Sequence, residues 1–576
     1  MRAIDQAGLL AHVIHWRLTW AKHDIDHRAP GLPRGGRFVT AREAVRLIPD
    51  GACVASTGMG GNMRPSILYW AVREEFERAG HPRGLTWVAV GGLGGRGRVP
   101  GTLEEVGRDG LVTRLVSGHL ETVKSFLALA DAGRCELHTM PQGVVAEAIE
   151  AQGRGEESVL TRVGVGTFVD PRVGTGTAVT PDGKPGLVAV EGDLLRYRVP
   201  RVQVALFLAT GADLRGNLYM DGATTITESR EAARAARRNG GKVIASVAAL
   251  VPEQPGRIFL PAAEVDAIVV NPRNEQTTSY PQRHPAAMLL PGAEVDVRAA
   301  ADRFDFVNHV LGITPRRGPA EQALARQAAA ILARAAGPGA RVNIGIGLPE
   351  EVGRLIQRGG LFDEVTFLVE TGAFGGLPVP GVFFGAAIRP ERHLSSVQMF
   401  RFMREELDVA VLGFLQVGRG GDVNVSRRGP RAADYVGPGG FIDVSSAART
   451  VIFVGASAAG ARVALEDGRI RLLRAGKPKL VERVDEITFR GEEALRRGQQ
   501  VWYATTDGTL RLTPRGLELA EVVPGADVAA LLRSPAGVVL PEQGAPLEVP
   551  RPVMTGEGFR LAWSGEHPRT PRQRAG

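Results

Sequence analysis

Helical and extended hydrophobic patterns alternate along the chain from residue 40 onward. A capping box begins at Thr40, and one apolar stripe follows over residues 41–48, so this segment is predicted to be a helix. The apolar run 52–57 (ACVAST) then predicts a buried strand, and 58–65 is a glycine-rich loop. The order helix, strand and glycine loop is typical of α/β proteins.

A second unit with the same order begins at Pro319. A helix is predicted from this proline, a favoured first helical residue, to the Gly-Pro pair at 337–338. Residues 341–344 (RVNI) predict the next strand, and 345–349 (GIGLP) the loop after it. Another helix is predicted over 349–360, with acidic residues in its first turn and glycines at its end.

Two longer apolar segments repeat at a constant offset of 205 residues. The first begins at Val204 (VALFLATG) and the second at Val409 (VAVLGFLQ), and the offset aligns these two valines. Each is followed by a further apolar strand, at 242–250 and at 449–455. Because several elements recur in the same order, we interpret the chain as a divergent internal duplication.

The predicted fold class is α/β, with two tandem, duplicated open α/β domains. Their sheets are expected to be mostly parallel, because the strands are apolar on both faces. Asp-Gly pairs at 467–468 and 507–508 predict antiparallel hairpins in the second domain. The predicted divisions are an N-terminal extension (1–37), a first domain (38–300), a linker (301–320), a second domain (321–540) and a loosely held C-terminal tail (541–576).

Composition narrows the classes of partner. The 576 residues are 44% hydrophobic and 23% charged, which is ordinary for a globular protein. Net charge is +8, but no run of five basic residues and no basic patch interleaved with aromatic residues occurs. We therefore expect no nucleic-acid partner, whereas a phosphate-bearing small molecule stays open.

The chain carries no sequence signal for a metal, a disulfide framework or a membrane. Cys53 and Cys135 are the only cysteines, and neither a CxxC nor an HExxH pattern occurs. The first twenty residues include an aspartate and two histidines, which argues against a signal peptide. No run approaches 18 uninterrupted apolar residues, so we expect a cytoplasmic protein without membrane partners.

Three glycine loops resemble phosphate-binding turns but fail in detail. Residues 92–97 (GLGGRG) match GxGxxG, yet Val99 and Pro100 follow where a helix would have to open. The loops 58–63 and 345–350 lack the last glycine. The nearest match to a serine-hydrolase elbow, GASAA from Gly455, also lacks its final glycine. Both a dinucleotide oxidoreductase and a serine hydrolase are therefore disfavoured.

Glu370 is the strongest candidate for chemistry. It ends the apolar segment 365–369, and Gly372, Gly375 and Gly376 follow it. Open α/β sheets bind ligands at the carboxyl ends of their strands, and glycines let a substrate approach the backbone closely. The alternative is a glutamate that simply turns out to solvent at the end of a strand.

Several segments together resemble class I coenzyme A transferases. The pattern E-x-G-x-x-G-G from Glu370 is similar to that family's active-site segment, apart from the variable position Thr371. The likeness extends from about residue 38 to 535, in the family's order. It includes TMPQGVVAEAI (139–149), VGVGTFVDPRVGTG (163–176), GPGGFIDVSSAARTVIFVG (437–455) and LTPRGLELAEVVPGADV (512–528). The nearest subgroup is the acetate and propionate CoA-transferases, whose two halves lie on one chain.

The resemblance implies exchange of coenzyme A between a short-chain acyl-CoA and a free carboxylic acid. Glu370 would be the nucleophile, with an acyl anhydride and a glutamyl-CoA thioester as intermediates. Gln142 and the backbone of Gly439 or Gly440, with Gly440 preferred as catalytic, would stabilise the oxyanion. Gly345, Gly347, Gly439 and Gly440 would line the coenzyme A site.

The resemblance also implies a homo-oligomer, with coenzyme A as substrate and no other cofactor. Two alternatives stay open. An acyl-CoA hydrolase would share every motif, because it differs only in whether water reaches the thioester. A catalytically silent binding protein is the other, although the Glu370, PQG and GPGG segments are all intact.

Overall fold

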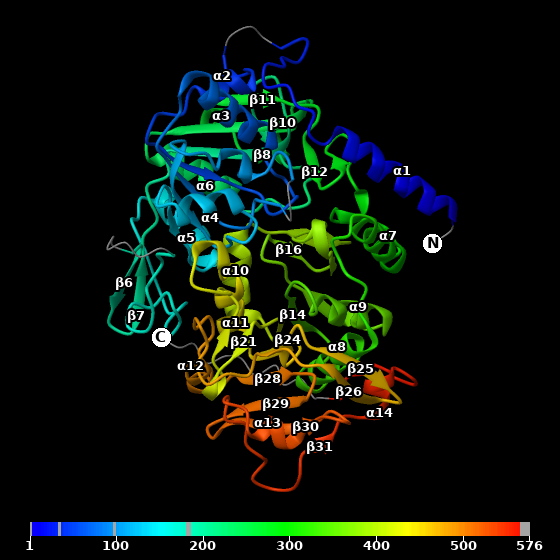
Figure 1. Cartoon of the computed structure of the whole chain (residues 1–576). Coiled ribbons are helices and arrows are strands. Elements are labelled where there is room, and N and C mark those ends of the chain that lie inside the picture. The colour runs from blue at the N-terminus through cyan, green and yellow to red at the C-terminus, as the bar shows by residue number, and fades with distance from the viewer. Residues whose placement is uncertain (1–2, 33–35, 96–98, 180–185, 565–576) are drawn as a thin grey trace.

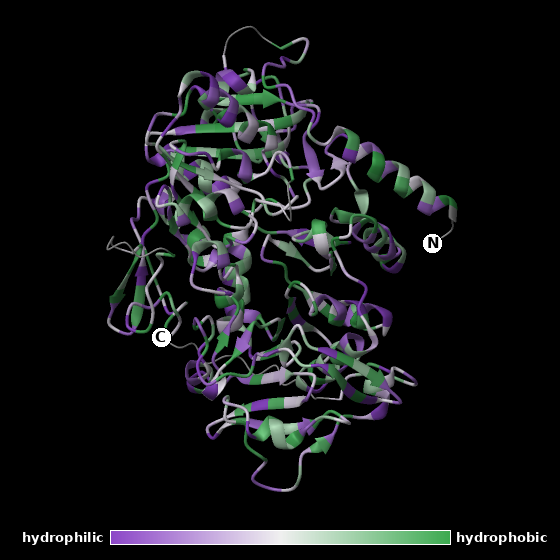
Figure 2. Cartoon of the chain, viewed as in Figure 1, coloured by the Kyte–Doolittle hydropathy of each residue, from purple (hydrophilic) through white to green (hydrophobic). Residues whose placement is uncertain are grey.

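Two sheets, one in each half of the chain, organise the molecule (Figure 1). The computed structural model describes residues 3–32, 36–95, 99–179 and 186–564. Figure 2 shows green, hydrophobic strands at the centre of each half, as expected where helices cover both faces of a parallel sheet. None of the helices in these ranges combines the length and apolarity that a bilayer crossing requires.

The first sheet has the strand order β11-β10-β8-β1-β2-β3-β4, with β9 paired to β8. All pairs are parallel except β8 with β9. Val54 packs with α2, α3 and α4 on one face, and Ala55 packs with α5 and α6 on the other. The bounds are β1 Cys53–Ser56, β2 Leu85–Ala89, β3 Val112–Ser117, β4 Glu136–His138, β8 Val204–Ala212, β9 Leu218–Tyr219, β10 Lys242–Leu250, β11 Ala267–Val270, α2 Ala41–Val45, α3 Ser66–Ala79, α4 Lys124–Asp131, α5 Gln142–Arg154 and α6 Ser229–Arg238.

The second sheet has the order β15-β14-β20-β23-β28-β29-β30-β31. It is parallel through β28 and antiparallel from β28 to β30. Helices α8 and α9 cover one face, and α10, α11 and α12 cover the other. The bounds are β14 Ala340–Ile344, β15 Val365–Phe367, β20 Val409–Leu412, β23 Thr450–Val454, β28 Gln500–Ala504, β29 Gly508–Thr513, β30 Gly516–Val522, β31 Leu547–Glu548, α8 Pro319–Ala335, α9 Glu350–Arg358, α10 Ser396–Glu406, α11 Phe441–Ala447 and α12 Gly491–Arg496.

The same five-strand arrangement occurs in both halves, which confirms the predicted duplicated α/β fold. The order β2-β1-β8-β10-β11 in the first half corresponds to β15-β14-β20-β23-β28 in the second. In the first half Val54 pairs with Val204, and in the second Val342 pairs with Val409, so the repeated valines occupy equivalent strand positions. The segment after β2 is therefore the counterpart of the segment after β15, which carries Glu370.

The halves pack through equivalent helices. Helix α5 of the first half contacts α10 and α11 of the second. Arg404 in α10 forms an ion pair with Glu147 in α5 at 2.7 Å, and the Thr225 hydroxyl donates a hydrogen bond to the Thr371 carbonyl at 2.9 Å. This packing brings the loops at the carboxyl ends of both sheets into one region.

Most predicted local elements are confirmed, with two shorter than expected. The capping box at Thr40 is present, but its helix ends at Val45. The strand before Glu370 ends at Phe367, because the chain turns back there to pair with its own continuation. The hairpin at 467–468 joins β25 (Arg462–Glu466) to β26 (Arg469–Arg474), and Asp467 and Gly468 both adopt positive φ, as its tight turn requires.

The remaining elements are short and lie mainly in connections. The strands are β5 Val159–Thr161, β6 Val188–Glu191, β7 Leu194–Tyr197, β12 Glu275–Thr277, β13 Tyr280–Pro281, β16 Ala373–Phe374, β17 Leu377–Pro378, β18 Ala387–Ile388, β19 Arg392–His393, β21 Gln416–Val417, β22 Val423–Asn424, β24 Ala458–Ala459 and β27 Lys477–Pro478. The helical turns are η1 Leu103–Val106, η2 Pro255–Arg257, η3 Ala262–Glu264, η4 Ala287–Leu289, η5 Phe362–Glu364, η6 Gly381–Phe383, η7 Arg419–Gly421, η8 Ala432–Asp434 and α13 Val528–Leu532.

The prediction of a loosely held tail is wrong for its described part, residues 541–564. Strand β31 pairs with β30, and α14 (Arg551–Thr555) packs on α8. The reason is Arg326, a buried guanidinium that donates to the carbonyls of Val553 and Met554 at 2.7 and 2.6 Å. A buried charge needs such acceptors, so it holds the tail in place.

The N-terminal extension also contains structure that the sequence interpretation did not anticipate. Residues Ala3–Thr19 form α1, which lies beside α7 (Val297–Val310) (Figure 1). Leu9 and Val13 are buried in the hydrophobic core of the second half. Helix α7 itself crosses residue 300, the predicted end of the first domain, so the exact domain boundaries stay predictions.

Candidate active site

Glu370 lies at the corner of a tight turn after β15. The Gly372 N–H donates to the Val369 carbonyl at 2.9 Å, and the Val369 N–H donates to Ala373 at 3.1 Å. Gly372 has a φ of +107°, and a Cβ there would lie 1.9 Å from the Leu394 carbonyl oxygen. No other residue fits this position without moving the backbone, so the glycine fixes how the chain presents Glu370.

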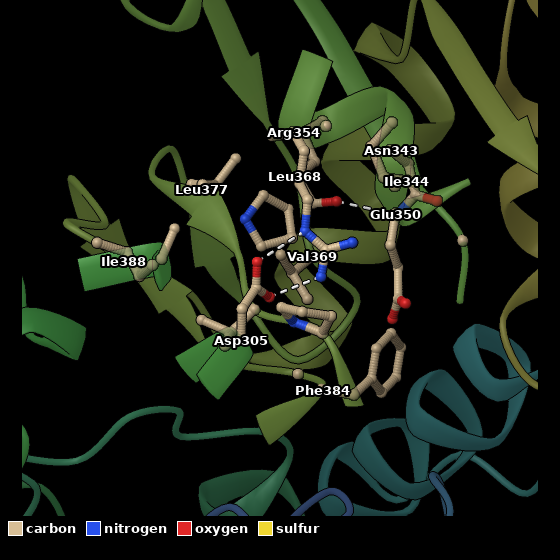
Figure 3. Close-up of a pocket in the computed structure, with 17 residues that line it drawn as sticks. Asp305, Asn343, Ile344, Glu350, Arg354, Leu368, Val369, Leu377, Phe384 and Ile388 are labelled. Atoms are coloured by element: carbon tan, nitrogen blue, oxygen red, sulfur yellow. Dashed lines mark hydrogen bonds and ion pairs between the residues drawn. The ribbon is translucent and has the colours of Figure 1, made fainter. Parts of the chain in front are cut away.

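A small cavity behind the turn shows how the strand end is fixed (Figure 3). The Asn343 side-chain amide donates to the Leu368 carbonyl at 2.9 Å. In the same cavity, of about 30 Å³, Arg354 forms a forked pair with Asp305, at 2.6 and 3.1 Å. The hydrogen bond ties β14 to the segment that leads into Glu370, and the ion pair joins α9 to α7 beside it.

The pKa of Glu370 is raised above its ordinary value of 4.5. Desolvation is the main cause, and hydrogen bonding from its own backbone N–H and from the Asn343 side chain acts in the opposite direction. The side chain is half-buried, with its open side toward a large cavity. A carboxylate held in poor solvation is more nucleophilic than one in water, provided that it is ionised.

Glu370, Gln142 and Gly440 converge on one point. A Cβ built on Gly440 would lie 3.1 Å from Cγ of Glu370 and 3.3 Å from Oε1 of Gln142. Gln142 is the first residue of α5 in the first half, whereas Gly440 precedes α11 in the second. Three residues that are up to 298 positions apart in the sequence therefore meet where the two halves pack.

Backbone hydrogen bonds distinguish Gly440 from Gly439. The Gly439 N–H donates to the Gly118 carbonyl at 2.7 Å, and the Gly439 carbonyl accepts the Gln142 N–H at 3.1 Å. Gly440 is the N-cap of α11, and its N–H has no hydrogen-bond partner within the described residues. Gly440 is thus the glycine with a backbone donor to offer, whereas Gly439 holds the two halves together.

All the predicted site residues line one cavity of about 750 Å³ between the halves. At Gly347 the φ is +93° and no atom lies within 4 Å of an added Cβ, so its backbone faces open space. The N–H of Gly345 is used by the Val411 carbonyl, at 2.8 Å. The residues brought together are Gln142, Gly345, Gly347, Glu370, Gly439 and Gly440.

Sequence reasoning missed a contribution from the loop after β2. Gly92, Gly94 and Gly95 line the same cavity, and the Gly60 N–H donates to the Gly92 carbonyl at 2.7 Å. This is the GLGGRG segment (92–97) that fails as a dinucleotide motif, and its last two residues, 96–97, lie outside the described residues. Its position opposite Glu370 follows from the duplication and could have been inferred from it.

Helix α1 also contributes to the cavity through Trp16, and Trp20, which follows the end of the helix at Thr19, lines it too. Together with Leu9 and Val13 these residues occur at helical spacing, a stripe that could have predicted a packed helix. No group of three or more His, Cys, Asp or Glu is placed to hold a metal ion in the described part of the chain. Cys53 and Cys135 are both buried thiols.

Asp443 links the two elements that carry Gln142 and Gly440. Its Oδ2 accepts the Gly143 N–H at 3.0 Å, across the interface between α11 and α5. Burial raises the pKa of this carboxyl to about 7, although the hydrogen bond from Gly143 and the nearby Arg404 oppose the shift. Gly143 is required beside it, because a Cβ there would lie 2.5 Å from Oδ1.

Comparisons with known proteins agree on one family. The family model described as coenzyme A transferase matches residues 38–271. The chain is 31% identical over 502 residues to a caffeate CoA-transferase of Acetobacterium woodii, covering 85% of this chain and 92% of the relative. It is 29% identical to the acetate CoA-transferase YdiF of Escherichia coli K12, covering 85% of this chain and 90% of that relative.

Solved structures give the same result. The apoenzyme of acyl-CoA transferase YdiF from E. coli O157:H7 superposes with a TM-score of 0.78 at 26% identity, covering 93% of this chain and all of that one. A second structure of the same protein, titled a thioester complex with CoA, superposes with a TM-score of 0.77. The match covers 92% of this chain and 98% of that one.

The buried Asp443 predicts a pH-dependent stability difference for Asp443→Asn. The folded pKa of about 7 exceeds the ordinary value of 3.8, so folded wild type binds more protons and loses stability as pH rises from about 4 to 7. Asparagine cannot ionise and still accepts from Gly143. Thermal unfolding should therefore show the variant gaining about 2–4 kcal/mol relative to wild type between pH 5 and pH 8.

The exposed Asp302 on α7 provides the control, since Asp302→Asn changes a carboxylate that is hydrated in both states. If the stability difference between Asp443→Asn and wild type is the same at pH 5 and at pH 8, the raised pKa of Asp443 is contradicted.

Proposed function

The chain belongs to the coenzyme A transferase family, and we propose that it moves coenzyme A between a short-chain acyl-CoA and a free carboxylic acid, with Glu370 as nucleophile. The observation that carries the proposal is the convergence of Glu370, Gln142 and Gly440 on one point in the cavity between the halves. In this convergence the poorly solvated carboxylate is that of Glu370, the side-chain amide that of Gln142 and the backbone N–H that of Gly440.

The first step forms an anhydride. A carboxylate oxygen of Glu370 attacks the thioester carbonyl, and the carbonyl oxygen becomes a tetrahedral oxyanion. The Gln142 amide and the Gly440 N–H are the donors for that charge, each worth roughly 3–4 kcal/mol in comparable sites. Collapse of the intermediate breaks the carbon–sulfur bond, releases the CoA thiolate and leaves an acyl–glutamyl anhydride.

The second step stores coenzyme A on the enzyme. The thiolate attacks the carbonyl carbon of Glu370, and the donor acid leaves as its carboxylate. The resulting glutamyl-CoA thioester then reacts with the acceptor acid through the same two steps in reverse, which restores the Glu370 carboxylate. Every intermediate is an activated acyl group, so neither ATP nor a redox cofactor is needed to drive the exchange.

The backbone near Gly345 and Gly347 is proposed to lie along the coenzyme A arm. Gly347 presents open backbone to the cavity, which suits close approach by a long, flexible ligand. The N–H and the carbonyl of Gly439 are already hydrogen-bonded to Gly118 and Gln142. Gly439 is therefore proposed to contribute to the coenzyme A site by positioning the adjacent Gly440. The thioester complex of the relative YdiF supports covalent storage of coenzyme A as a proposal for this chain.

Two further parts of the proposal rest on resemblance alone. The acetate and propionate type is the assigned subgroup, although the relatives are named for two different acids. A homo-oligomeric state is likewise carried over from the family, whereas the cytoplasmic location is proposed from the sequence, in which no run approaches 18 uninterrupted apolar residues. The acyl-CoA hydrolase alternative uses the same residues, so only the fate of the thioester separates the two activities.

Replacing the nucleophile should abolish the exchange. Glu370→Ala is expected to lower incorporation of labelled acetate into acetyl-CoA by several orders of magnitude, because the covalent intermediate cannot form. Glu405→Ala, an exposed glutamate on α10, is the matched control and should retain wild-type activity. If Glu370→Ala keeps more than about a tenth of the activity, Glu370 is not the nucleophile.

Removing the amide donor should affect turnover rather than binding. Gln142→Met keeps a side chain of similar length against Gly118 and Gly440 but has no N–H to donate. We expect kcat to fall by about 10²–10³ while KM for acyl-CoA changes little. Steady-state kinetics with acetyl-CoA measure both constants, and a change confined to KM would instead make Gln142 a ground-state contact.

Trapping the enzyme should separate a transferase from a hydrolase. With acyl-CoA and no acceptor acid, a transferase should hold the glutamyl-CoA thioester, and borohydride should then inactivate it by reducing Glu370. Intact-protein mass spectrometry should show the added coenzyme A before reduction. Initial-rate lines should be parallel in double-reciprocal plots, as for ping-pong kinetics. Release of free coenzyme A at the same rate with and without acetate would support the hydrolase.

A further inference from the structure

Glu228 is a buried carboxyl group at the interface between the halves, and the proposed reaction steps do not involve it. It precedes α6 of the first half, and it is only 2% exposed. Its Oε2 accepts a hydrogen bond at 2.7 Å from the hydroxyl of Ser396, the first residue of α10 in the second half. Oε1 has no partner in any other described residue. A carboxyl group buried in this way is costly to ionise.

The same short segment of the first half also contacts the turn that carries the proposed nucleophile. Within residues 225–229, the Thr225 hydroxyl donates to the carbonyl of Thr371, the residue directly after that nucleophile, at 2.9 Å. The Thr227 N–H donates to the Thr225 hydroxyl at 3.2 Å, and the Thr227 carbonyl accepts the Ser396 N–H at 3.1 Å. The 225–229 segment therefore links α10 to the nucleophile turn.

A second path runs from Ser396 to the turn along the main chain. The N–H of Leu394, two residues before Ser396, donates to the Gly372 carbonyl at 2.8 Å. The two backbones are so close that a Cβ on Gly372 would lie 1.9 Å from the Leu394 carbonyl oxygen. Because Gly372 fixes how the turn presents Glu370, a displacement of Ser396 is passed to the nucleophile through this contact.

Thr227 has a strained backbone conformation within the segment. Its φ is +43°, in the left-handed region that a β-branched residue rarely adopts. Its hydroxyl accepts the Gly58 N–H at 3.3 Å, and the hydroxyl oxygens of Thr57 and Ser229 are 2.7 Å apart. Strain of this kind persists where neighbouring contacts over-determine the backbone, and it is concentrated at functional sites.

The surroundings of Glu228 favour its neutral form. Desolvation is the main cause that raises its pKa to about 8, Glu231 on α6 acts in the same direction, and the hydroxyl that hydrogen-bonds to it acts in the opposite direction. Tyr69 on α3 also interacts with it electrostatically. The first charged residue of α10, Arg401, forms an ion pair with Glu150 instead. No ion pair to Glu228 occurs within the described residues, so its charge would be uncompensated.

We propose that Glu228 is a positioning residue for Glu370 and that it acts in its neutral form. As a neutral acid it accepts the Ser396 hydroxyl and keeps the 225–229 segment docked on α10 and on the nucleophile turn. An ionised Glu228 would place an unpaired charge in this interface, and the segment would move to let water reach it. The inference rests on the proposed transferase function, in which Glu370 must be ionised. Catalysis then needs one buried glutamate charged and another neutral, which gives a bell-shaped pH dependence.

Glu228→Gln tests the role of this ionisation in the full-length enzyme, by exchange of labelled acetate into acetyl-CoA. Glutamine keeps an oxygen acceptor for Ser396 but cannot ionise. With a pKa of about 8, roughly a tenth of the wild type has a neutral Glu228 at pH 9. The ratio of kcat for the variant to kcat for wild type should therefore rise about ten-fold from pH 7 to pH 9. A ratio that does not change with pH overturns the proposal.

The ratio isolates this one group, because Glu370 and Asp443 are present in both enzymes and their titration cancels. Glu405→Gln, an exposed position on α10, is the control, and its ratio to wild type should not depend on pH. Intact-protein mass spectrometry of the glutamyl-CoA adduct counts the active molecules at each pH, so that kcat is expressed per active molecule. A merely structural role would lower that count and leave kcat per active molecule unchanged, which would overturn the proposal.

Ser396→Ala tests the partner in the second half without altering Glu228 itself. We expect kcat at pH 7 to fall about 2–10-fold, as for the loss of one hydrogen bond. Because the hydroxyl favours the ionised form, its loss should also move the alkaline fall in kcat to higher pH. An unchanged kcat together with an unchanged pH profile overturns the proposal, also where Glu228→Gln does not fold.

The outcomes separate this inference from the proposed function. If wild type exchanges acetate at pH 7 but Glu228→Gln follows the same pH profile as wild type, only the positioning role fails. If wild type exchanges no acetate at any pH, the proposed function itself fails, and the positioning role fails with it.

Discussion

Two backbone hydrogen bonds across the halves, from Gly439 to Gly118 and from Gln142 to Gly439, set the geometry on which the site depends. They require close approach of main chains that are more than 290 residues apart in the sequence. A Cβ on Gly437 would lie 2.8 Å from the Gly118 carbonyl oxygen, so a side chain there would force the halves apart. With the halves docked in this way, Gly440 lies beside Cγ of Glu370 and Oε1 of Gln142 in the cavity.

The duplicated fold explains why the chemistry is divided unequally. Both halves place a glycine-rich loop at the carboxyl end of an equivalent strand, β2 in one and β15 in the other. Only the second loop carries a glutamate, whereas the first supplies small residues that leave room for a ligand. The first half instead contributes Gln142, at the start of α5. Neither half holds both the candidate nucleophile and the side-chain donor.

The sequence predicted much of this arrangement because buried strands and helix caps are local signals. The strands at Val204 and Val409, the helix start at Pro319 and the Asp-Gly hairpins all depend on neighbouring residues, and all are present. The convergence of Gln142 with Glu370 depends on how the halves dock, which local patterns do not encode; only the family resemblance paired them. The tail was misjudged because its anchor, Arg326, lies more than 200 residues earlier.

Joining both halves in one polypeptide has a consequence for assembly. Halves on separate chains would meet at a rate set by their concentrations, and dilution would separate the donor from the nucleophile. A covalent connection replaces the bulk concentration by an effective molarity, which is in the millimolar range for short flexible links. Here the connection runs through α7, which is itself packed against α1, so the partner half is held near its docking position. The two halves therefore assemble the site within a single molecule, and the fraction of molecules with a complete site does not depend on the protein concentration.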